Sequence, residues 1–558
     1  MLSLSVTPFT FRFTVPARSG RLLVIAALVL GMVLASSSAW ALGERLRMRL
    51  EAWDIGSQPA LEGCDVVNRN AVRSLYTDWQ YQPAWVLPGG ALTPAGEALL
   101  AQLRNAHLHG LDPAVYHGSC IVQLRSMVVQ DPAGRQVDLE LLLTDGLLLF
   151  LRHLRDGRLD PASAQPQWFI TFKRGELLPA GFQPSPEAVN EVVAKSEPQH
   201  PAYRALKAEY QRLLTQPAPP VPRVAKLLKP LQRSPDVALL VDYLVATELL
   251  AQAPEDTEYY SEALRDIVRA FQTRSGLEAD GIVGAATIEA LHQQRYGDAD
   301  RLRVNMERFR WLPEFGERYL LVDIAAFRLT AWANGEQQLA MNTVVGKSYR
   351  QTPIFSGNMR YVVLNPSWDV PHKIASQDIL ARVQANPAYL AETGMQVFQG
   401  WGADQTPIDP AQVDWNALTP KTFPYRLRQP PGPKNALGKV KFMFPNEHSV
   451  YLHDTNAPEL FNKSERSFSS GCIRLEKPLA LLDYLFASHP TWNGERRAAT
   501  LAGGKETTAM LAEPMPVHLV YLTANVNDSG DVVYRKDIYQ RDSRILAGLG
   551  KAYRPDGS

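Results

Sequence analysis

The fold of the C-terminal half is decided by two short stretches, Tyr-Leu-Leu-Val-Asp-Ile at residues 319–324 and Phe-Arg-Leu-Thr-Ala-Trp at residues 327–332. Apolar, aromatic and β-branched residues dominate both stretches, which is typical of strands. Asn334-Gly335 follows as a hairpin signal. Strand-like stretches recur at 339–345, 360–365, 440–444, 450–453, 517–522 and 532–534. We therefore predict a mostly-β domain over about 301–545.

One segment of this domain departs from the strand pattern. Residues 372–425 are helical and loop-like in character and contain Trp401 and Trp415. Because strands precede and follow this segment, we predict a helical cap or lid that is inserted into the β domain.

The chain upstream of residue 301 is predicted to be helical. Residues 144–155 form a dense apolar helix, and 216–222 form a proline-rich linker. We expect a helical scaffold over 42–236 and a small three-helix module over 237–295. The fold class is therefore multidomain α+β, as a length of 558 residues suggests.

The small module carries a recognisable pattern: Phe271-Gln272, Gly276-Leu277, then Asp-Gly-Ile-Val-Gly at 280–284 and a helix that begins at Thr287. Gly276 suits a helix C-cap and Gly281 suits a turn. The pattern resembles the peptidoglycan-binding domain type 1 family. A packing module whose glycines only form turns fits the same spacing, so ligand contacts cannot be assigned to Gln272, Asp280 or Thr287.

The first 41 residues are typical of an export signal. Basic residues without acidic ones precede an apolar run over 22–35, and Ser-Ser-Ser-Ala-Trp-Ala at 36–41 offers a cleavage site. An uncleaved anchor is the alternative. In either case the bulk of the chain is expected in an extracytoplasmic space, the periplasm. The formal net charge of +1 gives no case for nucleic acid as a partner.

Export changes the expectation for the three cysteines, Cys64, Cys120 and Cys472. In an oxidising compartment two cysteines tend to pair and an odd one suggests a reactive thiol. We therefore predict a disulfide between Cys64 and Cys120. The alternative is that all three are free and buried.

The residues that carry chemistry are Ser-Ser-Gly-Cys-Ile-Arg at 469–474 and Tyr-Leu-His-Asp-Thr at 451–455. A cysteine is a useful nucleophile only as the thiolate, and a nearby imidazole such as His453 can accept its proton. Gly471 has no side chain, so a substrate backbone can approach Cys472 closely. The N–H groups of Gly471 and Cys472 are candidates for an oxyanion hole.

This pair of stretches resembles the catalytic signature of the YkuD-type L,D-transpeptidases, and the resemblance is closest to their large YcbB-like members. Residues 304–313, 350–353, 365–368 and 431–438 also match those members, as does the order of the modules. Many relatives carry His where Ser470 stands and Asn where Arg474 stands. The first departure leaves His453 as the stronger base.

The resemblance implies roles for the remaining residues. The residue after the histidine orients the imidazole through its backbone carbonyl; here that residue is Asp454, whose carboxylate could serve instead. Arg474 lies on the same strand face as Cys472 and could bind a substrate carboxylate or pair with a protein acid. Tyr451 shares a face with His453 and could line the pocket or pack in the core. Ser470 is the third residue expected near the substrate.

The resemblance also implies the substrate. The cysteine would attack the carbonyl of the L-centre of a peptidoglycan stem peptide, release D-Ala, and pass the acyl group to a second stem as a 3→3 cross-link. Glycan and other cell-wall synthesis proteins are the expected partners, and carbapenems are expected to acylate Cys472. No metal or cofactor is expected. The alternatives are a carboxypeptidase or endopeptidase with the same residues, and a non-catalytic wall-binding protein. A metallopeptidase is disfavoured because no His-Glu-x-x-His occurs.

Overall fold

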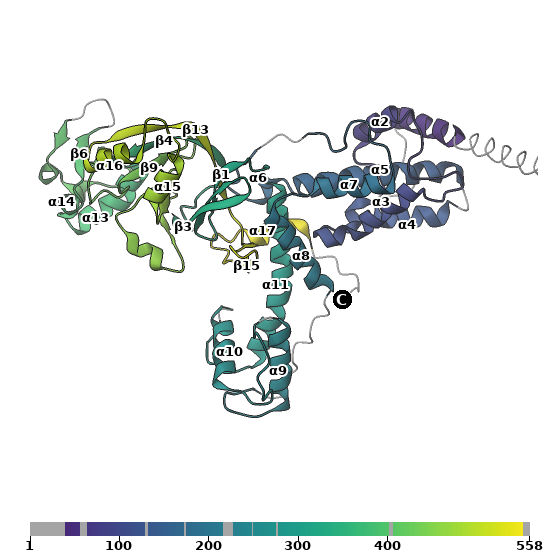
Figure 1. Ribbon diagram of the computed structural model, residues 1–558, viewed down its shortest axis with the longest axis horizontal. Helices are drawn as coiled ribbons and strands as arrows, with labels where there is room; N and C mark the ends of the chain where they lie inside the picture. Colours follow the sequence, from purple (N-terminus) through teal and green to yellow (C-terminus); the bar gives the residue numbers. More distant parts are fainter. Residues whose placement is uncertain are drawn as a thin grey trace, which may run out of the picture. The chain divides into compact units, whose positions relative to one another are not determined.

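The computed structural model describes residues 40–55, 64–128, 132–171, 175–215, 227–247, 249–274, 277–400 and 406–550. The chain divides into two compact units, Met1–Arg155 with Gly175–Glu197, and Asp156–Arg174 with Pro198–Ser558. The predicted multidomain α+β class is confirmed, because helices form the first unit and a sheet dominates the second (Figure 1).

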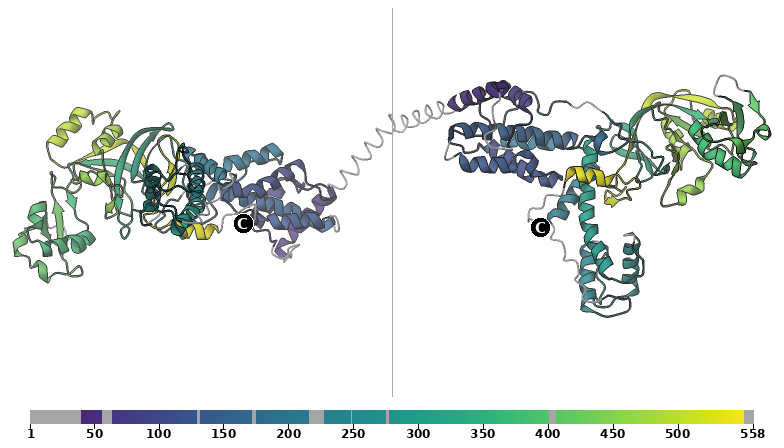
Figure 2. Two further views of the ribbon diagram at one scale, coloured as in Figure 1. Left: turned by 90° about the horizontal axis from the view of Figure 1, so that it is seen from below. Right: turned by 180° about the vertical axis from the view of Figure 1, so that it is seen from behind.

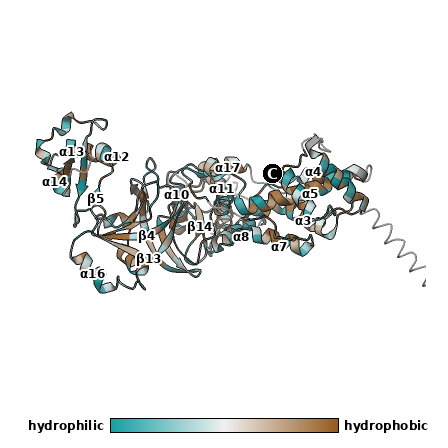
Figure 3. Cartoon of the chain, turned by 90° about the horizontal axis from the view of Figure 1, so that it is seen from above, coloured by the Kyte–Doolittle hydropathy of each residue, from teal (hydrophilic) through white to brown (hydrophobic). Residues whose placement is uncertain are grey.

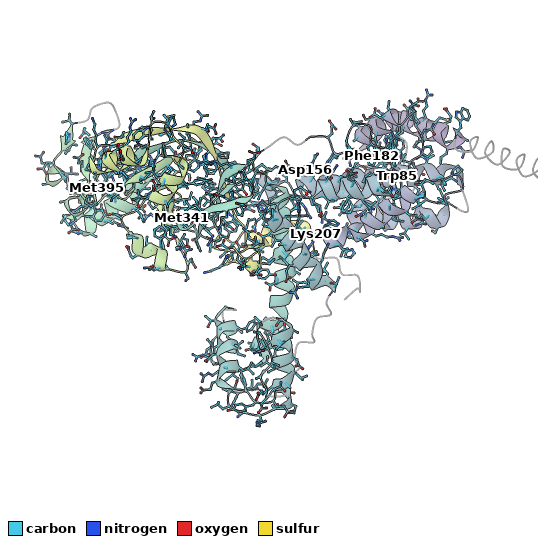
Figure 4. The ribbon with its side chains drawn as sticks, viewed as in Figure 1. Trp85, Asp156, Phe182, Lys207, Met341 and Met395 are labelled. Atoms are coloured by element: carbon cyan, nitrogen blue, oxygen red, sulfur yellow. A yellow bond between two sulfur atoms is a disulfide. The ribbon has the colours of Figure 1, made fainter. Side chains whose placement is uncertain are left out.

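The first unit is a helical bundle. Its main helices are α2 (Arg69–Asp78), α3 (Pro94–Arg104), α4 (Gly118–Met127), α5 (Pro132–Asp156) and α7 (Pro186–Ser196). Thr93 and Ser185 begin α3 and α7 by accepting the N–H groups of Gly96 and Ala188 at 3.0 Å each. The apolar faces of these helices meet in one core, which contains Trp85 and Phe182 (Figures 3 and 4).

Two features hold this unit together besides its apolar core. A disulfide joins Cys64 to Cys120 across a Cα–Cα distance of 5.9 Å, as the sequence suggests. The fully buried Glu140 carboxylate accepts the Val86 N–H and the Tyr76 hydroxyl, both at 2.8 Å. Because Glu140 belongs to α5, its carboxylate holds the turn around residue 86 against that helix.

The small helical module of the second unit contains α9 (Pro235–Ala246), α10 (Glu262–Arg274) and the beginning of α11 (Ala285–Arg310). The Gln272 amide donates to Asp280 Oδ1 at 2.9 Å and to Thr287 Oγ1 at 3.2 Å, and its oxygen accepts the Gly281 N–H at 2.8 Å. The three polar side chains of the sequence pattern therefore bond to one another and brace the turn. Gly276 lies outside the described residues.

The second unit contains a sheet with the strand order β11-β3-β12-β10-β9-β4-β13-β1-β2 in the part of the chain that is described. The strands are β1 (Arg318–Asp323), β2 (Arg328–Ala333), β3 (Glu336–Gly346), β4 (Ser356–Leu364), β9 (Val440–Met443), β10 (Leu452–His453), β11 (Ser467–Ser469), β12 (Ile473–Leu475) and β13 (Thr507–Val520). The two stretches quoted first form the β1–β2 hairpin. β15 (Val532–Tyr534), also predicted as a strand, pairs with β14 (Ala524–Val526) in a separate ribbon and not with this sheet.

The segment predicted as a helical cap is only partly helical. It contains α12 (His372–Ile374), α13 (Leu380–Ala385) and α14 (Tyr389–Thr393), and it contributes to a four-stranded sheet, in the order β5-β8-β6-β7, that extends beyond residues 372–425 at both ends. These strands are β5 (Trp368–Asp369), β6 (Gln396–Gln399), β7 (Pro407–Ile408) and β8 (Tyr425–Gln429). Helices and strands share a core of their own, so the cap is a small α+β subdomain (Figure 2).

The predicted scaffold boundary at residue 236 differs from the structure. Helix α8 (Pro201–Thr215) lies in the second unit, where it packs against α11. Its Tyr203 and Leu206 are fully buried and share a core with Phe309 of α11. The apolar face of α8 therefore assigns residues 198–215 to the second unit.

The predicted export segment falls almost entirely on residues 1–39, which lie outside the described residues, as does the linker at 216–222. Among the helices that are described, none combines the length and the apolar character that a membrane span requires.

Removal of the disulfide should destabilise the first unit. Closing a 56-residue separation removes entropy from the unfolded chain, for which loop-closure arguments give about 4 kcal/mol. The double variant Cys64→Ala/Cys120→Ala should therefore lower the urea midpoint of the helical unit, with Cys472→Ala as the control that leaves this midpoint unchanged. Equal midpoints in the wild type and the double variant would contradict a structural role for the bond.

Candidate active site

One face of the nine-stranded sheet carries the predicted site residues. Strands β10 and β12 pair in parallel, with Leu452 opposite Ile473 and His453 opposite Arg474. Leu452 and Ile473 are completely buried in the core. Because successive side chains of a strand point to opposite faces, His453 and Arg474 project together on the other face.

Tyr451 and Cys472 lie on that same face, two residues before His453 and Arg474. The Tyr451 and His453 rings have centroids 5.6 Å apart. The half-buried Cys472 places its Sγ 3.8 Å from the Ser449 carbonyl oxygen. The described residues show no direct hydrogen bond between the side chains of His453 and Cys472, so the two share a face without being bonded.

The loop that presents Cys472 is fixed by hydroxyl groups. Gly471 has φ +121°, a conformation that side chains rarely adopt, and this explains a glycine at that position. Thr352, which is completely buried, donates to the Gly471 carbonyl at 2.9 Å. Ser469 Oγ donates to the Cys472 carbonyl at 2.5 Å and accepts the Gly471 N–H at 3.1 Å.

The Gly471 N–H already donates to Ser469 Oγ in this structure. Its assignment as an oxyanion donor stays a prediction. The Cys472 N–H, by contrast, bonds to no described residue. Of the two predicted donors, only the Cys472 N–H is open to an incoming carbonyl oxygen.

His453 is buried and held in one tautomer. Its Nδ1 lies 2.5 Å from the backbone carbonyl of Asp454. Since a carbonyl oxygen only accepts, Nδ1 carries the proton and Nε2 keeps its lone pair. Burial first, and then the positive charges of Arg474 and Lys441, lower the pKa of His453 to about 3. The imidazole is thus neutral, and its Nε2 carries no proton in the resting site.

Asp454 orients the histidine through its backbone and not its carboxylate, which resolves the alternative that the sequence leaves open. The carboxylate accepts the Lys439 and Thr455 N–H groups at 2.7 Å each. Gly438 lies directly against it, with φ +60°, and a Cβ there would sit 2.3 Å from the Asp454 carboxyl carbon. The carboxylate therefore fixes the adjoining loop.

The Cys472 thiol is a weak acid in this setting. Burial raises the pKa of the Cys472 thiol, while hydrogen bonds from the Tyr451 backbone and hydroxyl and the charges of Lys441 and Arg474 lower it. Burial and the neighbouring Cys472 also raise the pKa of Tyr451, so its hydroxyl stays a neutral donor toward the sulfur. Tyr451 belongs to the site and does not serve only as core packing.

Arg474 forms no salt bridge with any described residue. Among the described residues no carboxylate lies within 4.0 Å of its guanidinium, and its buried Nε has no hydrogen-bond acceptor. Burial lowers the pKa of Arg474, and the negative charge of a Cys472 thiolate opposes that shift. The absence of a salt bridge favours the substrate-facing interpretation over the pairing with a protein acid.

Ser470 connects the site to the cap. Arg350 donates to Ser470 Oγ at 3.0 Å and forms a two-point salt bridge with Asp378, one contact of which is 3.1 Å. Asp378 lies in the helical turn Ala375–Ile379 of the cap. The residue beside the cysteine is therefore tied to the cap through one arginine.

Sequence reasoning missed Lys441 and Arg350. Lys441 lies in a stretch predicted as a strand, but alternation alone does not say which face it occupies. Arg350 lies in the stretch 350–353, which matches the YcbB-like sequences, but the sequence alone assigns no role to this arginine. Strand pairing identifies Lys441, and the contacts with Ser470 and Asp378 identify Arg350; only the folded chain supplies either signal.

Comparison with known proteins identifies three regions. Residues 317–491 match the family model described as "L,D-transpeptidase catalytic domain" (YkuD). Residues 233–291 match "Putative peptidoglycan binding domain", and residues 70–209 match "Scaffold domain". The first match falls on the sheet domain and the second on the small helical module. The third covers helices of the first unit and also the first part of α8.

A curated relative from Haemophilus influenzae, named "Putative L,D-transpeptidase", is 35% identical over 245 residues, which are 44% of this chain and 48% of the relative. The chain thus spans about half the length of the curated relative it matches. Two solved structures are also similar in part. An L,D-transpeptidase from Mycobacterium smegmatis is 15% identical, with a TM-score of 0.18 over 37% of this chain and 58% of that one. The Ldtfm–avibactam carbamoyl enzyme is 13% identical, with a TM-score of 0.19 over 38% and 51%.

The neutral state of His453 has a consequence for stability. Its pKa is about 3 in the folded chain and about 6.5 when unfolded, so between these values only the unfolded chain binds the proton. Stability should therefore fall as pH drops through this window. His453→Gln should reduce the loss of unfolding free energy between about pH 7 and about pH 5 by about 2 kcal/mol.

Urea midpoints at the two pH values measure this effect. The matched control is His372→Gln, because His372 is exposed in the cap. An equal pH dependence in the wild type and His453→Gln would contradict a buried, neutral imidazole.

Proposed function

We propose that this chain, which carries an L,D-transpeptidase catalytic domain at residues 317–491 and a peptidoglycan-binding domain at 233–291, forms 3→3 cross-links between peptidoglycan stem peptides. The observation that carries the proposal is the presence of Cys472, a free cysteine, on the same sheet face as a neutral, oriented His453 within the catalytic domain.

The acyl-enzyme forms in the first half of the reaction. His453 Nε2 accepts the Cys472 thiol proton, and the sulfur attacks the carbonyl carbon on the L-centre of the donor stem. The Cys472 N–H donates to the developing oxyanion. The C–N bond then breaks, His453 returns its proton to the leaving amine of D-Ala, and a thioester remains.

The second half transfers the acyl group. The side-chain amine of an acceptor stem attacks the thioester carbonyl and loses a proton to His453. The C–S bond breaks, an amide is formed, and the thiol is regenerated. Arg474 supports the assignment of the donor, because an unpaired guanidinium two residues from the nucleophile suits a carboxylate of the stem peptide.

The cap supports the choice of an amine over water as the acceptor. A thioester that must wait for a second stem benefits from exclusion of water. Arg350 joins the cap to Ser470 beside the nucleophile, so a closed cap and an ordered nucleophile loop go together.

Export to the periplasm is part of the same proposal, with a cleaved signal favoured over an anchor. The apolar run at 22–35 with small residues before position 41 supports a signal. The Cys64–Cys120 disulfide supports an oxidising compartment.

Replacement of the nucleophile tests the proposal directly. With purified disaccharide tetrapeptide as substrate, Cys472→Ala should lower dimer formation by more than about 1,000-fold, because no other group can form the acyl-enzyme. Products are resolved by mass. Wild type that yields only monomeric tripeptide would show a hydrolase, and a variant with unchanged dimer yield would refute the cysteine mechanism.

The role of the cap in excluding water can be tested by the ratio of the hydrolysis product to the cross-linked product. Arg350→Gln removes the salt bridge to Asp378, so water should reach the thioester more often and the ratio of tripeptide to dimer should rise several-fold. Arg360→Gln is the matched control, since Arg360 is exposed on β4. A ratio equal to that of the control would remove the cap from the proposed mechanism.

A further inference from the structure

A lysine lies in the same cross-strand row as the proposed base. Strand β9 pairs with β10 in antiparallel register, which places Lys441 opposite His453. Arg474 lies opposite His453 on its other side, in β12. Since directly paired side chains of neighbouring strands share a face, His453 stands between two cationic residues on the face that carries Cys472.

The environment of Lys441 is unusual for a lysine. The side chain is partly buried, and its Nζ lies 4.1 Å from the centroid of the Tyr451 ring. No carboxylate of the described residues lies within 4.0 Å of Nζ to form a salt bridge. An ammonium that is partly desolvated, stacked on an aromatic ring and without an acidic partner needs a compensating negative charge.

The Tyr451 ring that Lys441 contacts belongs to the same sheet face as the Cys472 sulfur. Burial lowers the pKa of Lys441, and the negative charge of a Cys472 thiolate opposes that shift. Glu506 and Asp369 contribute more weakly, and Glu459 acts on Arg474. The two cations that flank His453, Lys441 and Arg474, therefore share the sheet face that carries the sulfur.

His453 does not provide this counter-charge in the resting site. Its Nδ1–H is bound to the Asp454 carbonyl, and the cations on both sides oppose a second proton on the ring. A stable ion pair between imidazolium and thiolate is thus disfavoured. The positive charge that favours a thiolate must come from another group.

We propose that Lys441 is a positioning residue that stabilises the Cys472 thiolate, through Tyr451 and together with Arg474. The proposal rests on Cys472 as the nucleophile of the proposed function. In this arrangement the two cations lower the cost of the thiolate, and His453 only carries the proton between the sulfur and the departing or attacking amine.

The test measures the thiol and not the cross-linking reaction. Cys472 is the thiol available in the full chain, because Cys64 and Cys120 are bonded to each other. The rate of its alkylation by iodoacetamide, followed by mass between about pH 6 and about pH 10.5, reports the thiolate fraction. The variants are Lys441→Met, Lys441→Gln and Lys441→Arg.

Removal of the ammonium should raise the apparent pKa of Cys472 by about one unit, and so slow alkylation about tenfold at neutral pH. Lys441→Arg should restore the wild-type profile. Lys439→Met is the matched control: this lysine is exposed two residues earlier, and its loss removes the same charge.

Circular dichroism identifies folded variants, and Met and Gln are both made so that at least one neutral side chain is tolerated at the site. Neutral variants with the wild-type alkylation profile, or an equal shift in Lys439→Met, would overturn the proposal. If Cys472 alkylates as predicted but the protein does not form cross-links, the proposed function is refuted. The role of Lys441 in stabilising the thiolate then still holds.

Discussion

The pairing of β10 with β12 is the constraint on which the site depends. Nineteen residues separate these strands in sequence, yet their parallel register sets His453 against Arg474 and brings Tyr451 beside Cys472. A slip of either strand by one residue would turn the polar side chains of that strand into the core and move its buried apolar residue, Leu452 or Ile473, to the other face. The burial of those two apolar residues therefore enforces the arrangement of the polar ones.

Much of the fold follows from local patterns in the sequence. The β1–β2 hairpin and the helices of the first unit are predicted because strand alternation, turn residues and apolar spacing act over a few neighbours. The cap is only half predicted, since its sheet is made of strands as short as two residues, such as β5 and β7, which carry no period to detect. The placement of α8 depends on which core its apolar face joins, and that is a tertiary property.

The site residues also fall into two groups, those that the sequence predicts and those that only the folded chain reveals. Cys472 and His453 stand out in the sequence because their residue types and spacing carry chemistry on their own. Lys441 becomes visible only once β9 is placed beside β10, and Arg350 only once the cap is folded. The roles of Asp454 and Gly471 turn on backbone groups: a carbonyl that binds the imidazole, and an N–H that Ser469 already occupies. Residue identity does not encode such contacts.

The closed Cys64–Cys120 bond also limits what oxidation can do to the third cysteine. A sulfenic acid formed on Cys472 would find no second free thiol in its own chain with which to condense. Its repair would depend on a small thiol or a reductase from outside. The chain therefore offers no resolving cysteine of its own for an oxidised Cys472.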